Sequence, residues 1–256
     1  DERYLKDDSE LNQDTLKHAL EGAALVPSAG AMPIIGEALG ELARRYLIAE
    51  AVIDRLARII DTDALRCILE GTQIDLAHVA PGPIRESLGL STADRLVLCA
   101  GTLWPVKGQA ALLEAMIGLG DTAPGLHIAC VGFDVHGYGD ELRRGVEEHG
   151  LADRFWILPF TSDLSELYAA ADVLASTSVS ESVSASILEG MAHGLPVIGS
   201  AVGGTPELVI AGRTGWLYPP NDLTALRGVL AEVAAMSPAQ LRKRGGRARK
   251  LVAREH

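Results

Sequence analysis

Two glutamates in one short stretch, Glu181 and Glu189, carry the clearest chemistry in the sequence. Seven residues separate them within residues 178–204, which read SVSESVSASILEGMAHGLPVIGSAVGG. An ionised carboxylate only accepts hydrogen bonds, so Glu189 suits the vicinal hydroxyls of a ribose and Glu181 suits the hydroxyls of a further sugar. A helix beginning near Ser184 would offer unpaired N–H groups to an anion, which the helix dipole also favours. Together these features predict a site for a nucleotide diphosphate sugar.

A second interpretation applies to Glu189. With Ser186 it fits the S-x-x-E pattern of a capping box, in which the glutamate turns back to the serine N–H at a helix start. In that case the helix would begin later, and Glu189 would serve the helix end instead of a ligand. The local sequence leaves both interpretations open.

Two further loops hold candidate residues. Residues 101–108, GTLWPVKG, bring Lys107 to a helix start, where a cation opposes the helix dipole unless an anion lies nearby. Lys107 therefore either contacts a phosphate or is simply exposed, and the local pattern favours neither. In residues 160–163, Ser162 or Asp163 is expected to cap a helix, and the loop backbone is a candidate to bracket a nucleobase.

The elements that position these loops follow from an alternating pattern. From residue 66 onward, short apolar runs alternate with helices, which implies right-handed crossovers and an α/β fold with a doubly wound parallel sheet. Ligands of such sheets bind beyond the carboxyl ends of the strands, where the three loops would lie. The expected strands are residues 67–69, 96–100, 127–131, 155–158, 172–175, 196–198 and 216–218. The expected helices lie near residues 107–118, 140–148, 164–170, 184–192 and 223–235.

Composition narrows the class of protein. The chain has 256 residues, of which 48% are hydrophobic, enough for one large or two small domains with a sizeable core. A formal net charge of -11 argues against nucleic acid as a general partner, because phosphate backbones recruit basic surfaces.

The cysteines and the absence of a leader pattern suggest a compartment. Cys67, Cys99 and Cys130 each fall in an apolar run, which indicates reduced core thiols rather than a disulfide framework or a metal site. No basic-then-apolar leader opens the chain, and residues 19–39 are too interrupted by glutamate and proline for a membrane span. We therefore expect a soluble, cytoplasmic protein.

The first 60 residues differ from the rest. They show helical periodicity without a strand or a glycine-rich loop, which predicts a helical N-terminal extension. Asp61 and Asp63 match the D-x-D pattern that some sugar transferases use to hold a divalent metal. Their place just after a helix favours a cap or a turn, so no metal site is expected.

Six segments in register carry a resemblance to a known family. Residues 66–235 resemble the donor-binding C-terminal domain of GT-B glycosyltransferases, specifically the large retaining family four, or glycosyl transferase group 1. The matching segments are CAGTLWPVKGQAALLEAM, HIACVGF with DELRRGVEEHGLADRFWILPF, DLSELYAAADVLASTS, ESVSASILEGMAHGLPVIGS, AVGGTPELV and GRTGWLYPPND.

The resemblance implies a metal-independent, hexosyltransferase-like enzyme with a single Rossmann-like GT-B lobe. It implies a UDP-, GDP- or ADP-sugar as donor, no other cofactor, and retention of the anomeric configuration. Glu181, which matches the glutamate on the donor sugar, and Lys107, which matches the lysine on the diphosphate, are the expected catalytic residues. Glu189 matches the glutamate that binds ribose. The expected donor-binding residues are Gly101, Thr102, Lys107, Leu158, Phe160, Glu181, Ser182, Ser184, Ala185 and Glu189.

Two departures from the family pattern concern the phosphates. Thr102 stands where the family commonly has an arginine, so one expected cation is absent, at a cost of roughly 1.5–3 kcal/mol for a charge-assisted hydrogen bond. Ser184 stands where a glycine usually permits close backbone approach, and is expected to compensate as a helix cap or phosphate donor.

A third departure concerns the other lobe. GT-B enzymes act in a cleft between two Rossmann-like lobes, and the segment before residue 66 is too short for the N-terminal one. The sequence leaves three readings open: a fragment, a short form that borrows a lobe from a protein partner, or a non-catalytic nucleotide-sugar-binding or assembly module. A dinucleotide oxidoreductase is disfavoured because no G-x-G-x-x-G follows the first strand of the sheet.

The expected domain organisation has three parts. They are a helical extension over residues 1–60, a nucleotide-sugar-binding domain over 61–240, and a basic helix or tail over 241–256. The basic run RKRGGRARKLVAR indicates a solvated helix or a tail, with peripheral contact to an anionic membrane as the less favoured alternative.

Overall fold

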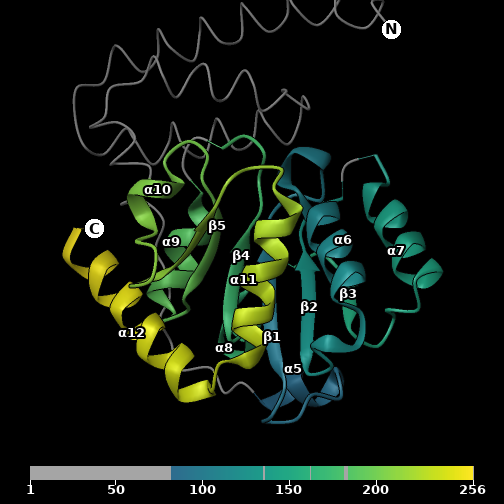
Figure 1. Ribbon diagram of the computed structural model, residues 1–256, viewed down its shortest axis with the longest axis horizontal. Helices are drawn as coiled ribbons and strands as arrows, with labels where there is room; N and C mark the ends of the chain where they lie inside the picture. The colour runs from purple at the N-terminus through teal and green to yellow at the C-terminus, as the bar shows by residue number, and fades with distance from the viewer. Residues whose placement is uncertain (1–81, 135, 162, 182–183, 256) are drawn as a thin grey trace, which may run out of the picture. The chain divides into compact units, whose positions relative to one another are not determined.

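A computed structural model describes residues 82–134, 136–161, 163–181 and 184–255 (Figure 1). The chain divides into two compact units, Asp1–Gln73 and Ile74–His256, and the described residues all belong to the second. The expected N-terminal helices, the strand at 67–69, the D-x-D pattern and Cys67 lie outside the described residues.

A six-stranded parallel sheet forms the centre of this unit, in the order β3-β2-β1-β4-β5-β6. All six strands expected within the described residues are confirmed to within about two residues at either end. Their continuous apolar runs reflect burial on both faces, as in β1, where every residue is buried. The strands are β1 (Arg95–Ala100), β2 (Leu126–Val131), β3 (Phe155–Leu158), β4 (Val173–Ser176), β5 (Val197–Ser200) and β6 (Gly215–Tyr218).

The chain runs outward from β1 through β2 to β3 and then returns to the other side of β1 at β4. Right-handed crossovers therefore place α6 and α7 on one face of the sheet and α8, α9 and α10 on the other, as Figure 1 shows. The strand order reverses between β1 and β4, where ligands of doubly wound sheets bind. The helices are α5 (Gly82–Ser87), η1 (Pro105–Lys107), α6 (Gln109–Leu119), η2 (Gly120–Thr122), α7 (Tyr138–Glu148), α8 (Ser165–Ala170), α9 (Ala185–Ala192), α10 (Thr205–Leu208), α11 (Leu223–Ala235) and α12 (Pro238–Glu255).

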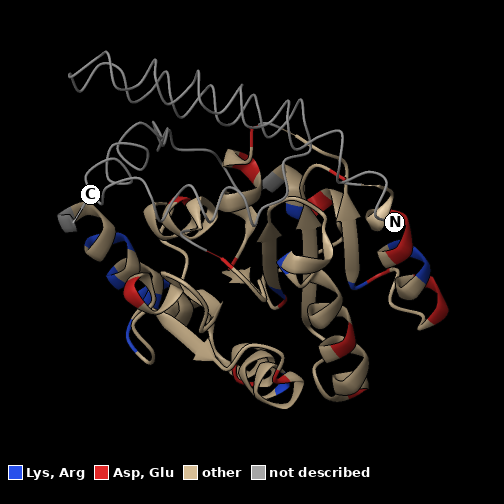
Figure 2. Ribbon diagram, turned by 90° about the horizontal axis from the view of Figure 1, so that it is seen from above, with Lys and Arg blue, Asp and Glu red and all other residues tan. Residues whose placement is uncertain are grey.

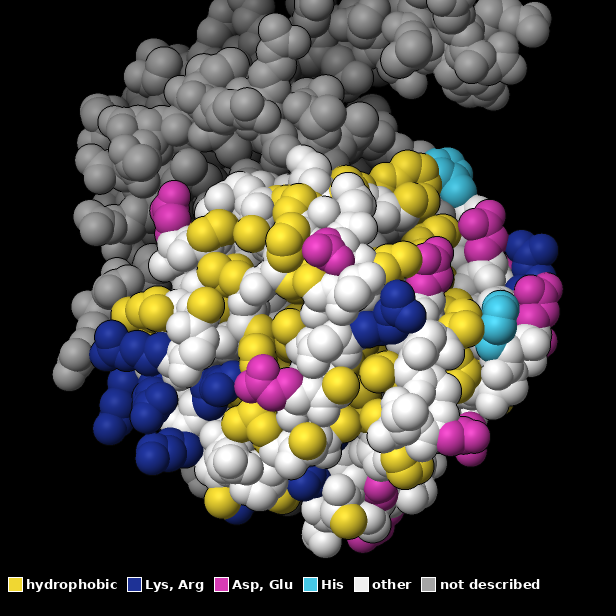
Figure 3. All heavy atoms as spheres, viewed as in Figure 1, with side chains coloured by type: hydrophobic (Ala, Val, Ile, Leu, Met, Phe, Trp, Pro, Cys, Tyr) yellow, Lys and Arg dark blue, Asp and Glu magenta, His cyan; other side chains and the backbone are white. Residues whose placement is uncertain are grey.

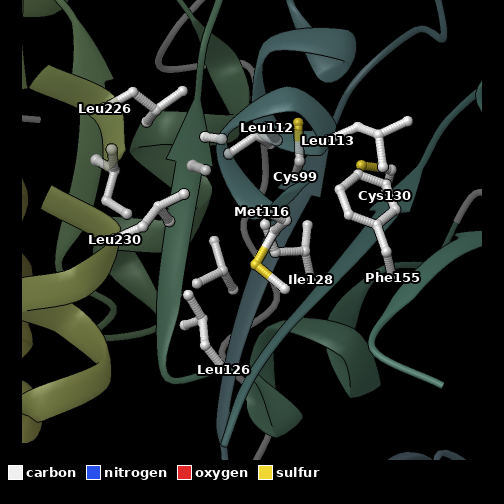
Figure 4. Close-up of a cluster of buried hydrophobic side chains, with 14 of the residues drawn as sticks. Cys99, Leu112, Leu113, Met116, Leu126, Ile128, Cys130, Phe155, Leu226 and Leu230 are labelled. Carbon is white, nitrogen blue, oxygen red and sulfur yellow. The ribbon is translucent and has the colours of Figure 1, made fainter. Parts of the chain in front are cut away.

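The main hydrophobic core lies between the sheet, α6 and α11. Leu112 and Met116 of α6 and Leu226 and Leu230 of α11 are fully buried there (Figure 4). Burying such a side chain contributes about 1.5–3 kcal/mol, so this layer anchors the strands whose ends carry the candidate site.

Cys99 and Cys130 belong to the same core and face each other across β1 and β2 (Figure 4). Both are free and buried, which confirms the expectation of core thiols for these two residues. A hydrogen bond with Cys99, followed by burial, raises the pKa of the Cys130 thiol, which favours its protonated form.

The basic C-terminal run is a helix rather than a tail. Three apolar side chains of α12, Leu241, Ala248 and Val252, are buried at helical spacing, and the helix packs against α9 and β6. Arg244 lies over the ring of Trp216, 4.1 Å from its centroid. Five other cations of α12 are exposed and form a basic surface at the edge of the unit (Figures 2 and 3): Arg242, Lys243, Arg247, Arg249 and Lys250. Within the described residues, no helix is long and apolar enough to cross a bilayer.

Candidate functional site

A cavity of about 270 Å³ lies at the carboxyl ends of β1 and β4, where the strand order reverses. The loops after these two strands and the first turn of α9 form its wall. Its lining residues are Cys99, Ala100, Gly101, Thr102, Lys107, Gln109, Ala175, Ser176, Thr177, Ser178, Glu181, Ser184, Ala185 and Ser186. Six of the ten expected donor-binding residues are therefore brought together here, although 74 positions separate Lys107 from Glu181.

Lys107 and Glu181 form an ion pair across this cavity. The lysine Nζ lies 2.9 Å from Oε2 of the glutamate, and Ser178 Oγ donates to the same oxygen at 3.2 Å. The side chains are only 20% and 9% exposed, so the interpretation of Lys107 as a simply exposed residue is wrong. Because the pair is partly buried, dissolved salt screens its attraction less than that of an ion pair on the surface.

The loop that carries Lys107 is fastened to the end of β4. The Thr177 hydroxyl lies 3.1 and 3.0 Å from the carbonyl oxygens of Lys107 and Gly108, to which it can donate. Gly108 adopts a left-handed φ of 72°, and a Cβ there would collide with the Thr177 carbonyl. The sequence GTLWPVKG therefore ends in a glycine because the chain must pass close to β4 at that point.

The first turn of α9 points at the cavity. Ser184 is its N-cap residue, with φ -89° and ψ 108°, and its Oγ lies 3.0 Å from Ser186 Oγ. Because this φ is negative, a side chain fits where the family pattern has glycine. The N–H groups of a helix's first turn lack partners within the helix, which together with the dipole makes this end suited to an anion.

Glu189 does not form a capping box. The helix already begins at Ala185, so Ser186 lies inside its first turn, and Glu189 Oε2 accepts a hydrogen bond of 2.7 Å from the Tyr168 hydroxyl. Glu189 is outside the cavity lining but sits three residues after Ser186, which lines it. Residues three apart on a helix are neighbours on one face, so Glu189 is about one turn away from the cavity wall.

The remaining expected residues lie at the neighbouring strand ends. Leu158 ends β3, and Phe160 follows it with 61% exposure. Its ring meets Phe133, from the loop after β2, edge to face with centroids 6.1 Å apart. These residues are therefore separate from the cavity, on the β2 and β3 side of it. Ser182 lies outside the described residues.

Gln109, Phe133 and Tyr168 were missed by the sequence reasoning. Gln109 is fully buried at the cavity wall, with Nε2 donating to the Thr102 carbonyl at 2.9 Å and no partner for Oε1 among the described residues. Helical periodicity places Tyr168 in the core but carries no signal of where its hydroxyl points. Phe133 is an apolar residue at a strand end, a position that the pattern alone assigns to no function.

The charges of the cavity wall balance one another. Among the residues that the structure describes, Lys107 and Glu181 are the only charged ones that line it. An anion bound here would therefore depend on Lys107, the backbone N–H groups of α9 and the surrounding hydroxyls. Within the described residues, no group of three or more His, Cys, Asp or Glu side chains could hold a metal ion.

Comparisons with known proteins bear on the fold and on the family. The sequence model of the family described as "Glycosyl transferases group 1" matches residues 94–235. A second model, the DNA gyrase B subunit insert domain, matches residues 23–84, nearly all of them outside the described residues. The D-inositol 3-phosphate glycosyltransferase of Mycolicibacterium vanbaalenii is 32% identical over 241 residues, which cover 88% of this chain and 53% of that protein.

Two solved structures with related sequences share the fold. HepE of Anabaena, in complex with UDP, is 28% identical with a TM-score of 0.60, covering 68% of this chain and 48% of that one. Sucrose-phosphate synthase from Thermosynechococcus elongatus is 34% identical with a TM-score of 0.58, covering 66% and 43%. The chain thus spans about half the length of these three relatives.

Proposed function

Because the chain belongs to the glycosyl transferase group 1 family and its sheet has GT-B relatives, we propose that residues 82–255 form the donor-binding lobe of a retaining glycosyltransferase. The donor is a nucleotide diphosphate sugar, and the acceptor comes from the other half of the enzyme. The observation that carries the proposal is the cavity in which Lys107, Glu181 and the first turn of α9 meet.

Each part of the donor has a counterpart at the strand ends. The diphosphate lies against Lys107 and the N–H groups of α9, where a cation and a helix dipole both favour negative charge. Glu189 accepts the ribose hydroxyls and Glu181 those of the sugar. The base lies against the backbone of the loop from Leu158 to Phe160. UDP is favoured as the nucleotide because the relative from Anabaena was solved with it.

The proposed transfer keeps the sugar's configuration. The bond between the sugar's anomeric carbon and the diphosphate oxygen breaks, and a bond from that carbon to the acceptor oxygen forms on the same face. The acceptor's proton passes to the leaving diphosphate oxygen. The protein orients the two reactants and stabilises the charge that develops on the diphosphate, for which Lys107 is placed.

Binding of nucleotide to the 256-residue chain tests this function directly. We expect calorimetry with UDP, GDP and ADP to show binding of at least one of them at or below millimolar concentration, with UDP strongest. No binding of any nucleotide at several millimolar would refute the donor site.

A non-catalytic nucleotide-sugar module is the second candidate, favoured by the pairing of Lys107 and Glu181, the two expected catalytic residues, with each other at the cavity. Both candidates bind nucleotide, but only the enzyme releases UDP from UDP-glucose in the presence of an acceptor. Turnover should be measured with and without a polypeptide that supplies the other lobe. Release of UDP in neither case, with UDP binding intact, would favour the module.

A further inference from the structure

The phenol of Tyr168 connects two helices on the same face of the sheet. It projects from α8, is only 3% exposed, and donates its hydroxyl hydrogen to Glu189 Oε2 on α9 at 2.7 Å. Its ring stacks on His193, with centroids 4.9 Å apart and planes inclined by 18°. Glu189 and His193 are four residues apart, so Tyr168 contacts two successive turns on one side of α9.

We propose that Tyr168 is a positioning residue, which fixes the Glu189 carboxylate in the orientation that accepts the ribose hydroxyls of the donor. The inference rests on the proposed function, since it assigns a task to a residue of that donor site. It adds α8, which does not line the cavity, to the elements that determine nucleotide affinity.

A glutamate needs such a partner to bind hydroxyls well. Its side chain has three rotatable bonds, so restricting it to one conformation costs conformational free energy. If the side chain is already ordered in the folded protein, this cost does not weaken ligand binding. A hydrogen bond between a hydroxyl and a carboxylate is short and strong, as the observed 2.7 Å indicates. Because Tyr168 donates to Oε2, the other carboxylate oxygen, Oε1, is left to accept from the ligand. The same hydrogen bond fixes the orientation of the Glu189 carboxylate.

The phenol is suited to remain a donor. Burial raises the pKa of Tyr168, and the neighbouring charge of Glu189 raises it further. The hydroxyl therefore stays protonated at physiological pH and continues to donate to the carboxylate. His193 stacks on one face of the ring and confines it, so the direction of the hydrogen bond follows from this packing.

A buried tyrosine can also be purely structural, and ribose selectivity separates the two roles. The experiment measures the affinities of the 256-residue chain for UDP and for 2′,3′-dideoxyuridine diphosphate, which lacks both ribose hydroxyls. We expect the wild-type chain to bind UDP at least tenfold more tightly than the dideoxy compound. Tyr168→Phe should weaken UDP about five- to tenfold and leave the dideoxy compound unchanged, so that the selectivity nearly disappears.

Tyr218→Phe is the matched control. It removes the hydroxyl of an equally buried tyrosine, 4% exposed, on β6. It should leave both affinities and their ratio at the wild-type values. Glu189→Asp supplies a second route should Tyr168→Phe fail to fold, because the carboxylate is kept but shortened away from Tyr168. Its UDP affinity should fall to that of the dideoxy compound.

Some results would overturn the positioning role alone, and another would overturn the proposed function as well. Wild-type UDP affinity in Tyr168→Phe, or equal losses for UDP and the dideoxy compound, overturns the positioning role while the donor site stands. Full UDP affinity in Glu189→Asp does the same. Absence of binding of UDP, GDP and ADP to the wild-type chain overturns the proposed function, and this inference with it.

Discussion

The two ends of the proposed donor site are held in different ways. The phosphate end consists of the loops after β1 and β4 and the first turn of α9. Hydrogen bonds and an ion pair hold these segments together. The Thr177 hydroxyl is hydrogen-bonded to the Lys107 carbonyl, and the Val179 N–H donates to the Val106 carbonyl at 2.8 Å. Lys107 also forms an ion pair with Glu181. At the base end, formed by the loops after β2 and β3, Phe133 and Phe160 are 58% and 61% exposed and contact each other edge to face.

This difference indicates where affinity originates. The phosphate end is preorganised, so changes there should affect both stability and binding. The base end presents apolar area that becomes buried only when a ligand arrives, so changes there should affect binding alone and by less. The following variants test that division, using urea unfolding for stability and UDP calorimetry for binding.

The largest effect is expected from Gly108→Val at the phosphate end. The left-handed backbone and the Thr177 carbonyl both oppose a side chain there, so the variant should lose about 2–5 kcal/mol of stability and more than a hundredfold in UDP affinity. Gly89→Val is the control, since Gly89 has a similar φ of 68° with open space around it. It should show only the backbone strain. Equal losses in the two variants would mean that the loop does not depend on its contact with β4.

Lys107→Met should have the next largest effect. It removes the cation that Lys107 contributes to the cavity wall and leaves the Glu181 carboxylate facing the diphosphate, so UDP affinity should fall about ten- to a hundredfold. Arg143→Met breaks the exposed pair with Asp140, and we expect no change from it. Unaltered UDP binding in Lys107→Met would remove the phosphate end from the donor site.

The sequence predicted the sheet more completely than the contacts within the site. Parallel strands buried on both faces read as apolar runs, which is why all six were found. The pairing of Lys107 with Glu181 was not predicted, because each was expected to meet the ligand separately. A pattern of residue types shows which loops share a strand edge but not which side chains reach one another across 74 positions. The hydrogen bond between Tyr168 and Glu189 was not predicted for the same reason.

The C-terminal helix shows a different limit. Its seven cations left a helix and a tail equally open, because charge alone decides neither. The helix forms because Leu241, Ala248 and Val252 are buried against the rest of the unit. The helical spacing of these three residues is visible in the sequence. It predicts a packed helix only once α9 and β6 are known to form the surface against which the helix packs.

Thr102→Arg sharpens the comparison in the opposite direction, because it should strengthen binding. Thr102 is exposed at the cavity wall, where the family pattern has a cation, and a guanidinium there can bind a phosphate with two hydrogen bonds. UDP affinity should rise about five- to tenfold. Thr224→Arg adds the same charge at an exposed position of α11 and should leave affinity as it is. If both variants strengthen binding equally, net charge rather than the cavity accounts for the gain.

The smallest effect is expected at the base end, from Phe160→Ala. Loss of one aromatic contact surface is worth about 0.5–1 kcal/mol, so UDP affinity should fall about two- to fivefold. Because the ring is mostly exposed, the free energy of unfolding should stay within about 0.5 kcal/mol of wild type. The loss should be larger for ADP than for UDP, since a purine covers more of the ring. A loss that matches Lys107→Met, or a clear fall in stability, would show that the base end is as preorganised as the phosphate end.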